Sequence, residues 1–215
     1  MTRRSWIGKD IRSALALSPP SYRDRQLGDL GKPIAAVLAA AAAIGAAGTR
    51  DTVADYVRQQ DEAVTVLEMS ALRAAAKKPR ARAHGDASLH VLASDCATRL
   101  RARIARPKRV AGDWSVELPA GCECDLCGSL RMFLSDKNQR TLQWPLAKHG
   151  RQHVHSRIDG AELPVTHLTR RQGRPYVLVL TKTDALFARE QEARARDQTD
   201  LEWLAHQWKD GADNR

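Results

Sequence analysis

The stretch Cys122-Glu123-Cys124-Asp125-Leu126-Cys127 places three cysteines within six residues. A Cys-x2-Cys turn allows two thiolates to reach one tetrahedral metal ion at about 2.3 Å, and soft thiolate ligands favour zinc. Further along the chain, RQHVH at 151–155 supplies His153 and His155, the first of them 26 residues beyond Cys127. This spacing is typical of the second half of a zinc site. The sequence therefore predicts a module built around a zinc ion.

The fourth ligand depends on the secondary structure around the histidines. On a strand, His153 and His155 would face the same way, whereas on a helix they would lie about 200° apart and only one would reach the ion. His167 is a third candidate. Three cysteines and one histidine would leave no position for an activated water, so we expect a structural zinc ion that contributes folding energy. The alternatives are a redox-active cysteine pair and three thiols without a metal.

Beyond these histidines the sequence predicts a β-hairpin. Val165, His167 and Thr169 alternate with residues of the opposite face, the turn RQGRP follows, and YVLVLTK at 176–182 forms a nearly continuous apolar strand. Gly173 would supply the positive φ that such a turn needs. We expect residues 116–183 to form a small Cys/His module that contains this hairpin.

The remaining sequence is predicted to be helical. Residues 1–115 show apolar side chains at helical spacing, and residues 184–215 form an amphipathic helix that would pack onto the protein or onto a partner through Trp203 and Trp208. Cys96 lies on the apolar face of its helix and is expected in the core. The predicted fold class is α+β, mostly α: an N-terminal helical segment, the zinc-stabilised module with its hairpin, and a C-terminal amphipathic helix.

The long apolar run Pro33–Gly48 is rich in alanine and shorter than the roughly twenty strongly apolar residues that a bilayer requires. The first eighteen residues contain no apolar core of the length that a secretion signal needs. We therefore expect a cytoplasmic protein without a membrane partner.

The net charge of +10 comes mostly from the middle of the chain, because residues 73–115 carry eleven basic and three acidic side chains. The basic stretch 73–109 and the hairpin turn predict nucleic-acid binding through phosphate contacts, and a solvated charged face is the alternative. The candidate contacts on the hairpin are Arg170, Arg171, Arg174 and Lys182, and those of the basic stretch are Arg101, Arg103, Arg106, Lys108 and Arg109.

Residues 122–183 resemble a Cys/His-rich C-terminal region of bacterial and fungal proteins described as 2-oxoglutarate- and Fe(II)-dependent oxygenase-like. The resemblance rests on the segments CECDLC, WPLAKHGRQHVH and ELPVTHLTRRQGRPYVLVLTKT. The resemblance implies a shared module. An oxygenase site would need an HxD motif on a strand, and the HxD of this sequence, His84-Gly85-Asp86, lies beside a basic loop at the start of a helical pattern.

Three function classes follow from these patterns. The first is a zinc-stabilised basic module that binds nucleic acid. The second is a protein-interaction or accessory domain of an oxygenase-like assembly. The third is a metal-dependent enzyme, an oxygenase or a nuclease, the nuclease using His153, His155 and His167 with Arg170 and Lys182. We identify no catalytic residue, and the sequence leaves open whether the chain is an enzyme.

Overall fold

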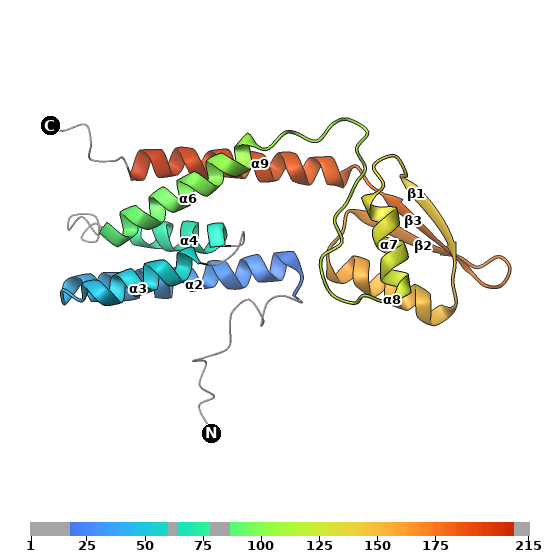
Figure 1. Cartoon of the computed structure of the whole chain (residues 1–215), viewed down its shortest axis with the longest axis horizontal. Coiled ribbons are helices and arrows are strands. Elements are labelled where there is room, and N and C mark those ends of the chain that lie inside the picture. Colours follow the sequence, from blue (N-terminus) through green and yellow to red (C-terminus); the bar gives the residue numbers. More distant parts are fainter. Residues whose placement is uncertain (1–17, 60–63, 78–86, 209–215) are drawn as a thin grey trace, which may run out of the picture. The chain divides into compact units, whose positions relative to one another are not determined.

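The computed structural model describes residues 18–59, 64–77 and 87–208 (Figure 1). The chain divides into two compact units, which we call the helical unit, Ser21–Arg106 with Ala193–Arg215, and the hairpin unit, Met1–Pro20 with Pro107–Glu192. Within the described residues there are seven helices and one three-stranded antiparallel sheet. The predicted fold class, α+β and mostly α, is confirmed.

The helical unit is built from α2 (Pro20–Ala43), α3 (Ala47–Arg58), α4 (Val64–Ala76), α6 (Ala87–Ala105) and the C-terminal part of α9 (Ala185–Gln207). Their apolar faces meet in one core, which includes Leu38, Leu67, Leu72, Leu92, Cys96 and Leu100. Cys96 is fully buried there, as predicted.

Helices α2 and α4 approach closely because one contact position has no side chain. A Cβ atom at Gly31 would overlap the Oγ of Ser70 on the facing helix. The same Ser70 hydroxyl donates a hydrogen bond of 2.5 Å to the carbonyl of Gly28. Glycine at position 31 therefore permits a contact that the serine then fixes.

Helix α9 contributes to both cores. The division between the two units falls between Glu192 and Ala193, inside this helix. Leu186 belongs to the core of the hairpin unit, and Leu204 belongs to the core of the helical unit. Trp203 and Trp208 pack, partly buried, against the helical core. The amphipathic helix predicted for residues 184–215 thus uses its apolar side chains within the protein.

The hairpin unit contains α7 (Asp125–Ser135), β1 (Thr141–Pro145), α8 (Lys148–Gly160), β2 (Val165–Arg170) and β3 (Val177–Lys182). The predicted hairpin is confirmed, since β2 pairs antiparallel with β3 and Gly173 has a φ of +75° in the turn. The short strand β1, which the sequence analysis did not predict, pairs with the other edge of β3 and gives the order β1-β3-β2.

The two faces of this sheet differ in exposure. Leu178 and Leu180 of β3 point inward and are fully buried with side chains from α7 and α8. On the opposite face, Thr166, Leu168 and Arg170 of β2 are exposed, Leu168 to 65%. The sheet therefore has one face against the core and one face open.

No helix in the described parts of the chain is both long enough and apolar enough to cross a membrane. The alanine-rich run from Pro33 to Gly48 is divided between two helices, since its larger part forms the second half of α2 and its last two residues begin α3. Ala35, Leu38 and Ala41 of this run are buried in the helical unit.

Candidate metal centre

Cys122, Cys124, Cys127 and His153 form a cluster whose potential ligand atoms all lie within 4.8 Å of one another. The Nε2 atom of His153 lies 3.4 Å from Sγ of Cys124 and 3.2 Å from Sγ of Cys127. A sulfur and a nitrogen bound to one tetrahedral zinc ion would be roughly 3.6 Å apart, given metal–ligand bonds of about 2.0–2.3 Å. These residues could therefore hold a metal ion with only small adjustments.

The two helices of the hairpin unit supply the donors. Cys124 is the N-cap residue of α7, Cys127 lies in the first turn of that helix, and His153 lies on α8. The preceding loop is tied to α8 because Arg157 donates a hydrogen bond of 2.7 Å to the carbonyl of Pro119. Nη1 of the same arginine would lie 2.6 Å from a Cβ at Gly121, where φ is +156°. The loop before Cys122 is thereby held beside the helix that carries His153.

The environments of two cysteine thiols differ. The backbone N–H of Cys127 at the start of α7 is the main group that lowers the pKa of Cys124, and the side chain of Cys122 adds to this effect. Burial raises the pKa of Cys127 to about 11. A positive ion bound between them would favour the thiolate form of both, because metal ligation requires deprotonated cysteine.

The structure distinguishes the three candidate histidines. Helix α8 directs His153 toward the cysteines, whereas the ring of His155 stacks against His167 with the ring centroids 4.1 Å apart. Nε2 of His167 lies 2.9 Å from Oδ1 of Asp159. Nε2 of His155 is buried without a hydrogen-bond partner among the described residues, and burial lowers the pKa of this imidazole. His155, a ligand candidate from the sequence, is not part of the cluster.

The five residues considered for a nuclease site are not brought together. His153 lies with the cysteines, while His155 and His167 contact each other. Lys182 is buried, and Arg170 lies on the open face of the sheet. The possible oxygenase residues His84 and Asp86 lie outside the described residues.

The predicted phosphate contacts on the hairpin have different surroundings. Arg170, Arg171 and Arg174 are exposed, and none of their guanidiniums forms an ion pair or hydrogen bond with another residue in the described ranges. Lys182 is fully buried, its Nζ donates a hydrogen bond of 2.6 Å to the carbonyl of Asp136, and it lies 4.7 Å from the ring centre of Phe133. Burial lowers the pKa of Lys182. This lysine is a core residue and leaves the set of candidate phosphate contacts.

In the basic stretch 73–109, some of the candidate phosphate contacts are exposed, and others form ion pairs or hydrogen bonds within the protein. Arg101, Arg106 and Lys108 are exposed. Arg103 forms an ion pair of 2.9 Å with Asp197. Arg109 bonds to Glu190 at 2.9 Å and to the carbonyl of Ser115 at 2.8 Å. Arg109 thus joins α9 to the segment that precedes α7, and its guanidinium is largely occupied.

Comparisons of the chain with protein-family models, curated proteins and solved structures found no match.

Proposed function

We propose that the hairpin unit is a zinc-stabilised module that binds nucleic acid through phosphate contacts. In this proposal Cys122, Cys124, Cys127 and His153 hold one structural zinc ion, and the hairpin tip contacts the phosphate backbone. The observation that carries the binding proposal is the set of three exposed guanidiniums, those of Arg170, Arg171 and Arg174, which form no ion pair with any described residue.

The donor set favours zinc as the occupant. Three thiolates and one imidazole are a common ligand set of structural zinc sites, and they are softer than the oxygen ligands that magnesium or calcium prefer. Four protein ligands also complete a tetrahedron, so such an ion would stabilise the fold and would not activate a water molecule. The ion would connect α7 to α8, which both pack against the sheet that carries the hairpin.

The position of these arginines at the open face of the sheet favours a large polyanionic ligand. Arg170 lies on this face at the end of β2, and Arg171 and Arg174 continue the positive charge into the turn. Three like charges in a five-residue segment repel one another, and an anion bound there relieves this repulsion. Phosphate contacts of this type provide affinity without reading the base sequence.

The proposal is tested with a triple variant, Arg170→Ala, Arg171→Ala and Arg174→Ala, in the full chain. We expect the variant to keep the far-ultraviolet circular dichroism of the wild type and to bind a short labelled duplex more weakly. The slope of log affinity against log salt should become shallower by about 0.9 for each phosphate that the variant no longer neutralises. Fluorescence anisotropy over a range of salt concentrations measures both quantities.

A matched control removes the same charge elsewhere in the hairpin unit. Arg131, Lys137 and Lys148 are exposed, and we expect their joint replacement by alanine to leave most of the affinity intact. Equal reductions of affinity in the two triple variants would show that binding follows net charge, and undiminished affinity in the arginine variant would show that the hairpin is not the binding surface. Either result would overturn the proposal.

A further inference from the structure

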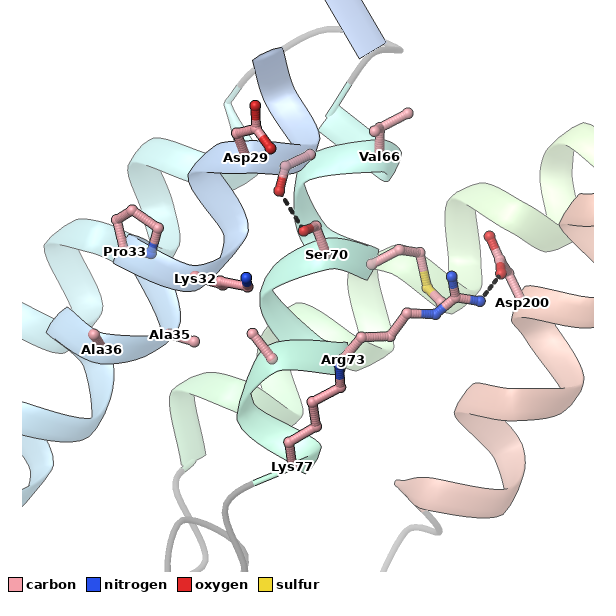
Figure 2. A pocket seen from close by; sticks show the side chains of 13 residues that line it. Asp29, Lys32, Pro33, Ala35, Ala36, Val66, Ser70, Arg73, Lys77 and Asp200 are labelled. Atoms are coloured by element: carbon pink, nitrogen blue, oxygen red, sulfur yellow. Dashed lines mark hydrogen bonds and ion pairs between the residues drawn. The ribbon is translucent and has the colours of Figure 1, made fainter. Parts of the chain in front are cut away.

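A second candidate site lies in the helical unit and is separate from the function proposed above. A cavity of about 900 Å³ opens between α2 and α4, with Asp200 of α9 at its edge (Figure 2). This volume lies within the range of roughly 300–1,000 Å³ that is usual for small-molecule sites. All of the lining residues belong to the helical unit.

The walls of this cavity are largely apolar. Pro33, Ala35 and Ala36 line it from α2, and Met69 and Ala74 line it from α4. Ala35 and Met69 are anchored in the core, with exposures of 8% and 4%. Small side chains leave the space between the helices open, and the contact between Gly31 and Ser70 fixes the distance between the two walls.

The charged groups around the opening are not balanced. Arg73 is engaged by Asp200 at 2.5 Å, and its guanidinium lies 5.6 Å from the ring centre of Trp203. Lys32 and Lys77 are exposed and make no ion pair with any described residue. Figure 2 shows the side chains of Lys32 from α2 and of Lys77, the residue that follows α4, around the same opening.

Asp29 is the other carboxylate at this site besides Asp200. Because Arg73 and Asp200 form an ion pair, the other charged residues of the lining are two ammonium groups and one carboxylate. The site therefore has an excess of positive charge beside an apolar wall.

We propose that this cavity binds a small amphipathic anion, with its acid group between Lys32 and Lys77 and its apolar part along the alanines of α2 and α4. A purely polar anion would leave the apolar wall in contact with water. A neutral apolar molecule would gain nothing from the two ammonium groups. An amphipathic acid satisfies both parts of the site.

Dodecanoate, kept below its micelle-forming concentration, is a suitable probe, and dodecanol and inorganic phosphate are the comparison ligands. Isothermal titration calorimetry on the full chain should show one dodecanoate per chain, with dodecanol at least about tenfold weaker. The double variant Lys32→Gln, Lys77→Gln should weaken dodecanoate binding by about tenfold or more. Arg25→Gln with Arg101→Gln removes the same charge from exposed positions outside the cavity and should leave binding unchanged.

A cavity-filling variant tests the apolar part of the site. Ala36 is an exposed lining residue, so Ala36→Phe should fill the groove without disturbing the core and should abolish binding while thermal unfolding remains normal. The proposal is overturned if dodecanoate does not bind, if the acid and the alcohol bind equally, or if both double variants weaken binding equally. Displacement of dodecanoate by phosphate at similar concentrations would also overturn it, because the apolar wall would then contribute nothing.

Discussion

The Sγ atom of Cys127 and the Nε2 atom of His153 lie 3.2 Å apart, although 26 residues separate them in the sequence. Cys127 is buried in the first turn of α7, and His153 is half-buried on α8. The contact therefore joins the two helices that cover the inner face of the sheet. A metal ion held at this point would act as a cross-link between them, and its removal would loosen the whole hairpin unit.

The first prediction concerns the cysteines. Cys124→Ser and Cys127→Ser should each abolish stoichiometric metal binding and unfold the hairpin unit, because each removes one of four ligands. The helical unit, which has its own core, should remain folded. Metal content is measured by elemental analysis, and the fate of each unit by amide hydrogen exchange. Cys96→Ala is the control, because this buried thiol lies in the helical core and its removal should not change the metal content.

The second prediction compares two histidines on one helix. His153→Ala should lower the affinity for zinc by at least about tenfold, which competition with a chromophoric chelator measures. His155→Ala should retain the metal, since the ring of His155 contacts His167 and not the cysteines. If the two variants released zinc to the same degree, the assignment of His153 as the fourth ligand would be wrong.

The third prediction concerns a buried acid in the helical unit. Glu68 is fully buried, and neither carboxylate oxygen has a hydrogen-bond partner among the described residues. Burial, with repulsion from Asp95, raises its pKa from 4.5 to about 8. Between these two values the unfolded state binds fewer protons than the folded state, so the free energy of unfolding should fall as pH rises, by up to about 1.4 kcal/mol per pH unit.

Urea denaturation of Glu68→Gln, followed across this pH range, should show a much flatter dependence and greater stability than the wild type at the alkaline end. Glu202→Gln, which changes an exposed carboxylate on α9, should follow the wild-type profile. If stability of the wild type increased with pH through this window, the assignment of a raised pKa to Glu68 would be incorrect.

The fourth prediction uses two glycines of the same helix. Gly31→Ala would place a methyl group on top of the Oγ of Ser70, so α2 and α4 must separate, and we expect a destabilisation of about 1–3 kcal/mol. Gly28→Ala meets nothing within 4 Å and should be neutral or stabilising by up to about 1 kcal/mol, since alanine favours the helix. Chemical denaturation measures both changes, and similar effects of the two variants would contradict the close approach of the helices.

Local patterns in the sequence were sufficient to predict the main elements. The alternation around His167, the turn at Gly173 and the apolar run before Lys182 predicted the hairpin, because pairing within a hairpin depends on neighbouring residues. Strand β1 was not predicted, since TLQWP is short and ends in proline, and it becomes a strand only by pairing with the distant β3. Whether His153 or His155 reaches the cysteines could not be decided without knowing that residues 148–160 form a helix.

The burial of two charged residues, Lys182 and Glu68, could not be predicted from the sequence either. Lys182 ends an apolar strand, where a lysine usually faces solvent, yet its ammonium reaches the carbonyl of Asp136, 46 residues away in the chain. Glu68 lies in an apolar helix without any local signal of a partner. In both cases burial is decided by tertiary packing, which local periodicity does not report.

Helix α9 also has a consequence for how the protein folds during synthesis. Leu186 belongs to one core and Leu204 belongs to the other, so both cores lack a buried side chain until α9 has been synthesised. Apolar surface of both units then stays accessible to chaperones until the same helix has emerged. A ribosome that stalls before it has translated Ala185 would therefore leave two incomplete units on one nascent chain.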